Sequence, residues 1–335
     1  MGSGHIAVVT GGAGFIGSHM VDLLLAEGYE VRVIDNLTGG RRDNLAHHAS
    51  NPRLCVEVQD LRDVQPGDPL FAGARYVFHF AGIGDIVPSI NRPVDYLSAN
   101  VMGTIHALEA ARHSNVRKFV YAASSSCYGL VRELPTTEQA SIDPQYPYAL
   151  SKYLGEEAVL HWGRVYQLPV VSVRIFNAYG PRSRTTGAYG AVFGVFLAQK
   201  LHGKPFTVVG DGTQRRDFVF VTDLARAFWL AGECERAQAV YNVGGGNPQS
   251  VNRLVELLGG DVVHVPKRPG EPECTWADIS KIRRELGWAP RVTFEDGVNA
   301  VLRHINYWRQ APLWDPASIQ EATKEWFATL AGVSR

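Results

Sequence analysis

The sequence has neither an excess of one charge nor a long apolar run. Lys and Arg total 33 and Asp and Glu total 33, so the formal net charge at pH 7 is zero. A balanced chain has no overall field to draw it to nucleic acid or an anionic membrane. No run of 18 apolar residues is present, and the chain enters a predicted strand almost at once, leaving no room for a signal peptide. We therefore expect a cytoplasmic protein that binds neither nucleic acid nor membrane and holds any anionic ligand by local contacts.

Cysteine is also scarce. Cys55, Cys127, Cys234 and Cys274 show no CxxC pair and no metal-ligand spacing. An intracellular protein has little use for disulfides. We expect four buried free thiols and no metal site.

The 335 residues are 45% hydrophobic, enough for one large domain or two moderate ones. Apolar strands alternate with amphipathic helices through the first half, for example a helix over residues 96–111. Such alternation predicts an α/β, Rossmann-type doubly wound parallel sheet covered on both faces. The expected strands are residues 6–10, 30–34, 54–58, 76–80, 118–122 and 170–175.

The rhythm changes after about Phe176, where Gly- and Arg-rich loops separate shorter elements. We expect residues 1–175 to form a nucleotide-binding domain and residues 176–335 a smaller α/β substrate domain, with segments near 216–243 crossing back into the main sheet. No internal repeat is visible. Expected here are strands at 218–221 and 239–243 and helices at 223–233 and 295–308.

A glycine-rich turn, TGGAGFIG, follows the first strand and opens a helix. Gly11, Gly14 and Gly17 allow a tight turn, a close approach to a pyrophosphate and close packing of the helix on the strand. The helix N-terminus offers N–H donors to the anion. This context predicts a dinucleotide site.

An acidic residue selects among dinucleotides. Asp35 ends the next strand, 18 residues after Gly17, where its carboxylate can accept both ribose hydroxyls and would repel a 2′-phosphate. NAD is favoured over NADP, although Arg41 and Arg42 leave NADP open as an alternative to an ordinary solvated loop. Asp60, with Leu61, ends a further strand near the expected adenine, where a simple strand-end cap is equally compatible.

Ser124, Tyr148 and Lys152 are the candidate catalytic residues. Ser124 ends the fifth predicted strand, and ligands bind at the carboxyl ends of parallel strands. Tyr148 and Lys152, in PYALSK, lie four apart and so on one face of a helix starting near Pro147. A phenol has a pKa of about 10, so a tyrosine base requires a nearby cation to favour phenolate. Lysine and an oxidised nicotinamide both supply that charge, so the pattern indicates a redox enzyme acting on an alcohol.

With these residues, the chain resembles the extended short-chain dehydrogenase/reductases, specifically the nucleotide-sugar epimerases. The likeness runs through TGGAGFIGSH, FHFAG, NVMGT, YAASSSCYG, PYALSK, RIFNAYGPR, RRDFVFVTD and WADISK. The resemblance implies that Tyr148 is the base, Lys152 its electrostatic partner and nicotinamide-ribose ligand, and Ser124 the hydroxyl clamp. It implies NAD contacts from Gly11, Gly14, Phe15, Ile16, Gly17, Asp35, Asn36, Asp60, Leu61, Phe80, Ala81, Gly82, Asn100, Tyr148, Lys152 and Phe176. It implies UDP-sugar contacts from Ser125, Ser126, Asn177, Tyr189, Val192, Arg216, Arg268, Glu271 and Thr275, with the arginines on the diphosphate and nucleotide.

The residues after the clamp bear on the reaction. In the family, 4,6-dehydratases carry Asp and Glu directly after the Ser or Thr clamp, and UDP-glucuronate decarboxylases carry Glu two residues after it. Ser125 and Ser126 occupy these positions here. We therefore expect C4 epimerisation through a transient 4-keto sugar, with a dehydratase or decarboxylase of the same family as the alternative. A catalytically silent NAD-sensing protein would have no need of Ser124, Tyr148 and Lys152 together.

Two features of the sequence bear on which sugar is bound. Thr275 stands where galactose-type relatives can have a bulky residue, and GAYGAV at 187–192 resembles the UDP-N-acetylhexosamine 4-epimerases. We expect UDP-GlcNAc/UDP-GalNAc or UDP-Glc/UDP-Gal, with the uronates also open. Gly84, where some galactose epimerases have a lysine, weakens the link to that subgroup. By the same resemblance, helices over residues 96–111 and 148–165 should form a four-helix contact in a homodimer.

Overall fold

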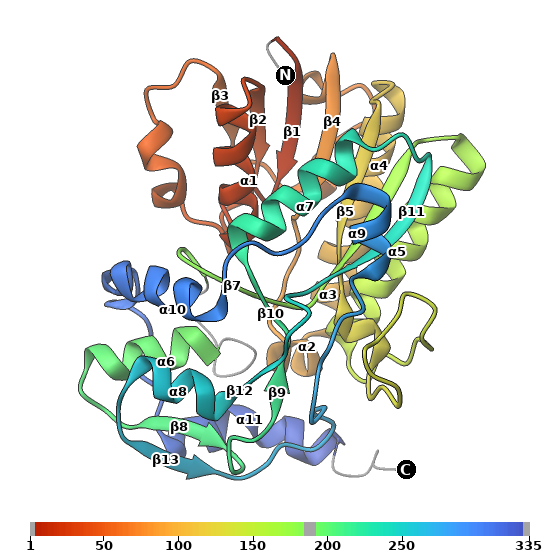
Figure 1. Ribbon diagram of the computed structural model, residues 1–335. Coiled ribbons are helices and arrows are strands. Elements are labelled where there is room, and N and C mark those ends of the chain that lie inside the picture. The colour runs from red at the N-terminus through yellow and green to blue at the C-terminus, as the bar shows by residue number, and fades with distance from the viewer. Residues whose placement is uncertain (1–3, 184–191, 331–335) are drawn as a thin grey trace.

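A seven-stranded parallel sheet forms the centre of the molecule in the computed structural model, which describes residues 4–183 and 192–330 (Figure 1). Its strand order is β11-β6-β5-β4-β1-β2-β3, and every neighbouring pair is parallel. The predicted fold class is confirmed. Its strands are β1 (Ile6–Thr10), β2 (Glu30–Ile34), β3 (Leu54–Glu57), β4 (Ala74–His79), β5 (Lys118–Ser124), β6 (Val170–Ile175) and β11 (Gln238–Val243).

Helices cover both faces of this sheet. The helices from the first half of the chain are α1 (Phe15–Ala26), α2 (Val87–Asn91), α3 (Pro93–Leu97), the π-helical turn η4 (Ser98–Met102), α4 (Gly103–His113) and α5 (Pro147–Tyr166). The second half of the chain contributes α7 (Val221–Glu233) and α9 (Ser280–Leu286). Short 3-10 turns are η1 (Arg42–His48), η2 (Leu61–Asp63), η3 (Pro69–Phe71), η5 (Ser125–Tyr128) and η6 (Ile305–Trp308).

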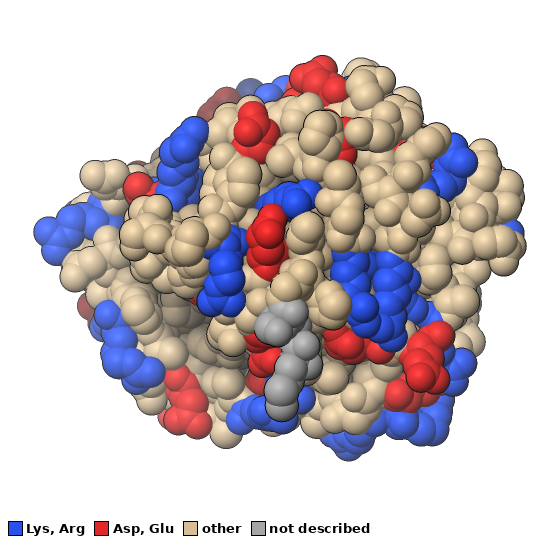
Figure 2. Space-filling view, turned by 90° about the horizontal axis from the view of Figure 1, so that it is seen from above, with Lys and Arg blue, Asp and Glu red and all other residues tan. Residues whose placement is uncertain are grey.

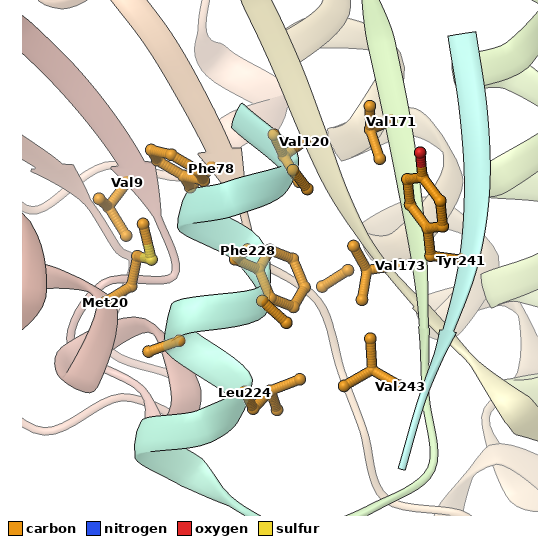
Figure 3. Packing of buried hydrophobic residues seen from close by; sticks show 14 of the residues in the cluster. Val9, Met20, Phe78, Val120, Val171, Val173, Leu224, Phe228, Tyr241 and Val243 are labelled. Carbon is orange, nitrogen blue, oxygen red and sulfur yellow. The ribbon is translucent and has the colours of Figure 1, made fainter. Parts of the chain in front are cut away.

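Adjacent strand residues face opposite layers, because side chains alternate along a strand. One core cluster packs the sheet against α1 and α7, where Phe228 and Leu224 meet the strand residues seen in Figure 3. A second cluster packs the other face against α4 and α5. Val9, Phe78 and Val120 belong to the first cluster, and their neighbours Val8, Val77 and Phe119 belong to the second. Burial on both faces explains why these strands are almost continuously apolar.

The remaining elements form a smaller part that lies below the main sheet in Figure 1. It has its own aromatic core, which includes Tyr179, Phe193, Phe218 and Trp308. Its two-stranded sheets are β7 (Asn177–Tyr179) with β10 (Phe218–Phe220), β9 (Arg215–Arg216) with β12 (Gln249–Ser250), and β8 (Phe206–Val209) with β13 (Val262–Val265). Its helices are α6 (Val192–Leu201), α8 (Val251–Leu258), α10 (Phe294–Arg303) and α11 (Pro316–Leu330).

Three expectations differ from the structure. The helix expected over residues 295–308 is α10, which ends at Arg303, followed by the separate 3-10 turn η6. The helix expected over residues 96–111 is split into α3, η4 and α4, because one π-helical turn interrupts the hydrogen-bond ladder between them. All four cysteines are free, but only Cys127 is buried; Cys55 is exposed because β3 lies at the sheet edge. The prediction of four buried thiols was therefore wrong for the other three.

The charged side chains are mixed in sign on the face shown in Figure 2, in keeping with the zero net charge. Among the described residues, none of the helices is both long and apolar enough to cross a bilayer.

Candidate functional site

The glycine turn brings the start of α1 close to the ends of β1 and β4. Gly11 has a φ of +68°, and a Cβ there would lie 2.6 Å from the Ala81 nitrogen. A Cβ on Gly17 would lie 2.2 Å from the Gly11 carbonyl oxygen. Gly14 caps α1 with no side chain, so the first helical N–H groups, at Phe15 and Ile16, are left for a ligand. A pyrophosphate fits a cradle of this kind.

Asp35 lies at the end of β2, beside this turn, and its side chain is held in place. Its carboxylate accepts hydrogen bonds from the backbone N–H of Ala13 at 3.0 Å and of Leu37 at 2.8 Å. Burial raises the pKa of Asp35, while these two hydrogen bonds oppose the rise. The carboxylate is therefore oriented beside the cradle, where a ribose diol can reach it.

Asp60, in the loop after β3, is hydrogen-bonded to Asn36, which follows β2. The Asn36 amide donates to Asp60 at 2.9 Å, and Arg62 donates to both Asp60 oxygens. Asp60 also caps η2, and its hydrogen bonds to Arg62 hold its pKa well below the usual range. Asp60 is thus the N-cap of η2, three residues after β3 ends at Glu57, and Leu61 is buried in the core against α4.

The segment after β4 is held from behind by Asn100, in the π-helical turn. Its amide oxygen accepts from the Ile83 N–H at 2.7 Å, and its amide nitrogen donates to the Ile83 carbonyl and to Ser151. A Cβ on Gly82 would lie 2.7 Å from the same amide oxygen. Asn100 therefore fixes the backbone at Gly82 and Ile83, just after β4 ends.

Ser124 ends β5 at the carboxyl edge of the sheet. Its hydroxyl lies 2.7 Å from the Ser126 hydroxyl and accepts a hydrogen bond from the Ser126 N–H at 3.2 Å. The Ser124 side chain is thereby fixed at the mouth of the cavity described below.

Tyr148 and Lys152 share the first turns of α5, which Pro147 starts. A buried ion pair between Glu156 and Arg174 of β6, at 2.6 Å, fixes this helix on the sheet. Lys152 is only 7% exposed, and its ammonium lies 4.5 Å from the centroid of the Tyr121 ring. Burial lowers the pKa of Lys152 to about 7.

A cavity of about 380 Å³ opens between the main sheet and the smaller part. It joins residues from β5, α5, β7, β9 and the loop before α9, although these lie far apart in the sequence. Of the predicted nucleotide-turn residues, Phe15 alone lines it. The other predicted residues on its wall are Ser124, Ser125, Ser126, Tyr148, Phe176, Asn177, Val192, Arg216, Arg268, Glu271 and Thr275. Tyr189 lies outside the described residues.

Two pairs of predicted substrate residues bond to each other. Arg216 and Glu271 form a 2.6 Å ion pair, and the same guanidinium donates to the Pro272 carbonyl. The Thr275 hydroxyl donates to the Asn177 amide oxygen at 2.7 Å. These contacts orient the guanidinium and the amide toward a common cavity wall.

The sequence reasoning did not select Tyr146, Gln145 or Ile319, which also line the cavity. Tyr146 could have been found from its place two residues before Tyr148. Ile319 could not, because it lies in the C-terminal helix with no motif around it.

Comparison with known proteins identifies the family. The model of the NAD dependent epimerase/dehydratase family matches residues 7–244. The chain belongs to this family. A putative UDP-glucose 4-epimerase of Methanocaldococcus jannaschii is 35% identical over 303 residues, covering 88% of this chain and 96% of that protein.

Solved structures agree with this assignment. The UDP-N-acetylglucosamine 4-epimerase of Methanobrevibacter ruminantium, in complex with UDP-N-acetylmuramic acid, has a TM-score of 0.86 and 31% identity over 92% of this chain and 99% of that one. The UDP-glucuronic acid 4-epimerase of Bacillus cereus, in complex with UDP-glucuronic acid and NAD, has a TM-score of 0.83 and 31% identity over 90% and 99%. Nucleotide-sugar dehydratases and decarboxylases are further relatives.

Proposed function

We propose that this protein is an NAD-dependent 4-epimerase of UDP-sugars. One observation carries the proposal: a single cavity brings Ser124 and Tyr148 together with Arg216 and Arg268, while the residues after Ser124 are both hydroxyl side chains. The first two groups suit oxidation of an alcohol, and the arginines suit a diphosphate. The names of the relatives point to the same reaction.

NAD fits the cradle made by Gly11 and Gly17, with Asp35 on its adenosine ribose. The chemistry that bound NAD would supply is reversible hydride transfer at C4 of the sugar. We propose that the predicted cofactor residues hold it along the carboxyl edge of the sheet, with Phe176 at the nicotinamide end of the cavity.

The chain's own residues move the proton. Ser124 holds the C4 oxygen of the sugar, and the Tyr148 oxygen takes the hydroxyl proton as the carbonyl forms. The partly charged Lys152 behind it favours the phenolate. The same proton returns from Tyr148 to the oxygen when the 4-keto sugar is reduced, so neither proton nor coenzyme is consumed.

The nucleotide end is proposed to bind through Arg216, Arg268 and Asn177, with Glu271 on the uridine ribose. Because Arg216 already pairs with Glu271, a bound diphosphate would share the guanidinium with that carboxylate. Guanidinium forks suit such shared contacts.

For the sugar, we propose UDP-GlcNAc and UDP-GalNAc first, then UDP-Glc and UDP-Gal. Thr275 lines the cavity with a small side chain, which leaves room for a 2-acetamido group. Differences of this size change discrimination by only about 1–3 kcal/mol. UDP-glucuronate therefore also belongs among the substrates to test.

The experiment incubates the purified enzyme separately with UDP-Glc, UDP-GlcNAc and UDP-GlcA and follows the anomeric protons by NMR. We expect the C4 epimer as the main product, with no added NAD consumed. A 4-keto-6-deoxy sugar, or a UDP-pentose with release of carbon dioxide, would favour the dehydratase or decarboxylase alternative instead.

We also propose a homodimer formed through the helices over residues 96–111, which include the end of α3, η4 and most of α4, and over residues 148–165 in α5. These neighbouring elements carry exposed apolar side chains, and burying such side chains against a second copy of the chain would be favourable. They are Val94 (73% exposed), Met102 (46%), Leu150 (41%) and Leu154 (38%).

The division of the chain at residue 175 stays a prediction. The cytoplasmic location also stays a prediction, and the four free thiols support it.

A further inference from the structure

Asn44, in η1, is a buried residue beside the glycine turn. It is only 4% exposed, and its amide nitrogen donates to the Ala13 carbonyl at 2.8 Å. The backbone N–H of Arg41 donates to the same carbonyl at 2.9 Å. Asn44 and Arg41 therefore hold the middle of the glycine turn from outside.

Ala13 joins these contacts to the proposed adenosine site. Its backbone N–H donates to the Asp35 carboxylate at 3.0 Å, while its carbonyl accepts the hydrogen bonds from Asn44 and Arg41. A shift of Ala13 would therefore disturb both the glycine turn and the orientation of Asp35. The position of Ala13 is thus a condition for binding NAD at this turn.

A tyrosine of the smaller part contacts both residues that hold Ala13. Tyr307, in η6, donates its hydroxyl to the Asn44 amide oxygen at 3.0 Å. The Arg41 guanidinium lies over the Tyr307 ring, 5.1 Å from its centroid, and this ring packs on the aromatic core of the smaller part. The Asn44 side chain therefore links the smaller part to the glycine turn by two hydrogen bonds in series.

The backbone of Asn44 is held as well, from the segment after β7. Arg182 donates to the Asn44 carbonyl at 3.1 Å and also forms an ion pair with Asp22 of α1. Its φ is +64°, a conformation that residues other than glycine rarely adopt unless the surrounding structure holds them. η1 is therefore bonded both to α1 and to the chain that leads out of the main sheet.

We propose that Asn44 is a positioning residue for the NAD turn and that Tyr307 fixes it, so that the smaller part contributes to NAD affinity. This inference rests on the proposed place of NAD at the glycine turn, and it does not depend on which sugar is bound. Because the proposed reaction leaves NAD unconsumed, contacts that retain the coenzyme favour repeated turnover.

The test measures the Kd for NAD by calorimetric titration of the full-length protein freed of cofactor. Tyr307→Phe keeps the ring beside Arg41 and removes only the hydroxyl, so we expect the Kd to rise about three- to tenfold, the effect of one hydrogen bond. Asn44→Ala also removes the bond to Ala13, and the Kd should rise by more than about tenfold. In the double variant, Tyr307→Phe should add nothing to Asn44→Ala, because the hydroxyl acts through this amide.

Tyr29→Phe is the matched control. The Tyr29 hydroxyl donates to Glu233 at 2.8 Å, next to the start of β2 and so at the opposite end of this strand from Asp35. This variant also loses one part-buried hydrogen bond, but it should bind NAD as the wild type does. The Kd for UDP should be unchanged in every variant, since Asn44 and Tyr307 lie outside the described lining of the cavity.

The outcomes separate this inference from the proposed function. If the wild type binds NAD and Tyr307→Phe binds it equally well, the inference is wrong while the NAD site and the reaction stand. Additive losses in the double variant would likewise overturn the route through Asn44. A wild type that binds no NAD would remove the proposed NAD site and this inference together. A thermal melt shows that each variant is folded, and Tyr307→Phe against Tyr29→Phe decides the matter if Asn44→Ala unfolds.

Discussion

Lys152 combines deep burial with a position beside the proposed base. Burial lowers its pKa from an ordinary 10.5 to about 7. At neutral pH the ammonium and the amine are therefore both populated, and a nearby phenolate would favour the ammonium. A buried lysine at this position can respond to the charge on Tyr148, which an exposed lysine would feel much less.

This pKa has a consequence for stability. Between pH 7 and about 10, Lys152 is protonated in the unfolded chain but largely neutral in the folded one, so the free energy of unfolding should rise with pH. The contribution reaches at most about 1.4 kcal/mol for each pH unit. In urea titrations of the cofactor-free protein at pH 7, 8 and 9, Lys152→Met should lose this rise. Equal pH slopes for the two proteins would show that Lys152 keeps an ordinary pKa.

Tyr148 carries the proposed proton transfer, and Tyr148→Phe removes only its oxygen. We expect turnover of the preferred UDP-sugar to fall by about 10²–10⁴-fold, the range for a general acid–base group. NAD carried by the purified protein, measured by absorbance after denaturation, should be retained. Tyr166→Phe, at the exposed end of the same helix, serves as the control. Retention of most activity in Tyr148→Phe would remove the tyrosine from the role of base.

At the scale of the element, the close packing of the glycine turn predicts that it will not tolerate a larger side chain. A Cβ on Gly17 would lie 2.2 Å from a backbone oxygen that cannot move independently. We expect Gly17→Ala to weaken NAD binding at least about tenfold, or 1.4 kcal/mol, and to lower the melting temperature. Gly103→Ala is the matched control, since its Cβ would meet only Leu61 at 3.7 Å and alanine favours a helix. Calorimetric titration with NAD measures both variants, and equal affinities would contradict the cradle.

The sequence predicts those helices and strands that are set by residues close together in the chain. The strand at 6–10, the helix beginning at Pro147 and the strand at 170–175 agree with the structure because period, caps and proline act within a few residues. The interruption at η4 was not predicted, since the π-helical turn goes with the contacts of Asn100 to Ile83 and Ser151. Tertiary contacts of this kind have no signal in the local period.

The candidate site likewise has residues that the sequence could predict and contacts that it could not. Ser124, Tyr148 and Arg216 could be selected because their motifs are recognisable, and the structure places them on one cavity. The pairing of Arg216 with Glu271 and the approach of Trp326 to Tyr146 could not, because they join residues 55 and 180 positions apart. Such contacts depend on how the two parts of the molecule close over the cavity.

At the scale of the whole molecule, the proposals give α5 two roles on opposite sides. Its inner side holds Lys152 and Glu156, both buried, while Leu150 and Leu154 are exposed. The helix that carries the proposed base therefore also borders the proposed dimer contact. Packing of α5 against a second copy would further restrict the helix that carries Tyr148.

The dimer can be tested by charging this surface. Leu154→Glu places a carboxylate among exposed apolar side chains, so burial of that surface against a second copy would become unfavourable. We expect light scattering at micromolar concentration to give a dimer for the wild type and a monomer for Leu154→Glu. Leu313→Glu, at a similarly exposed leucine outside α3, η4 and α5, should remain dimeric. A monomeric wild type, or a variant that stays dimeric, would place the exposed leucines of α5 outside any subunit contact.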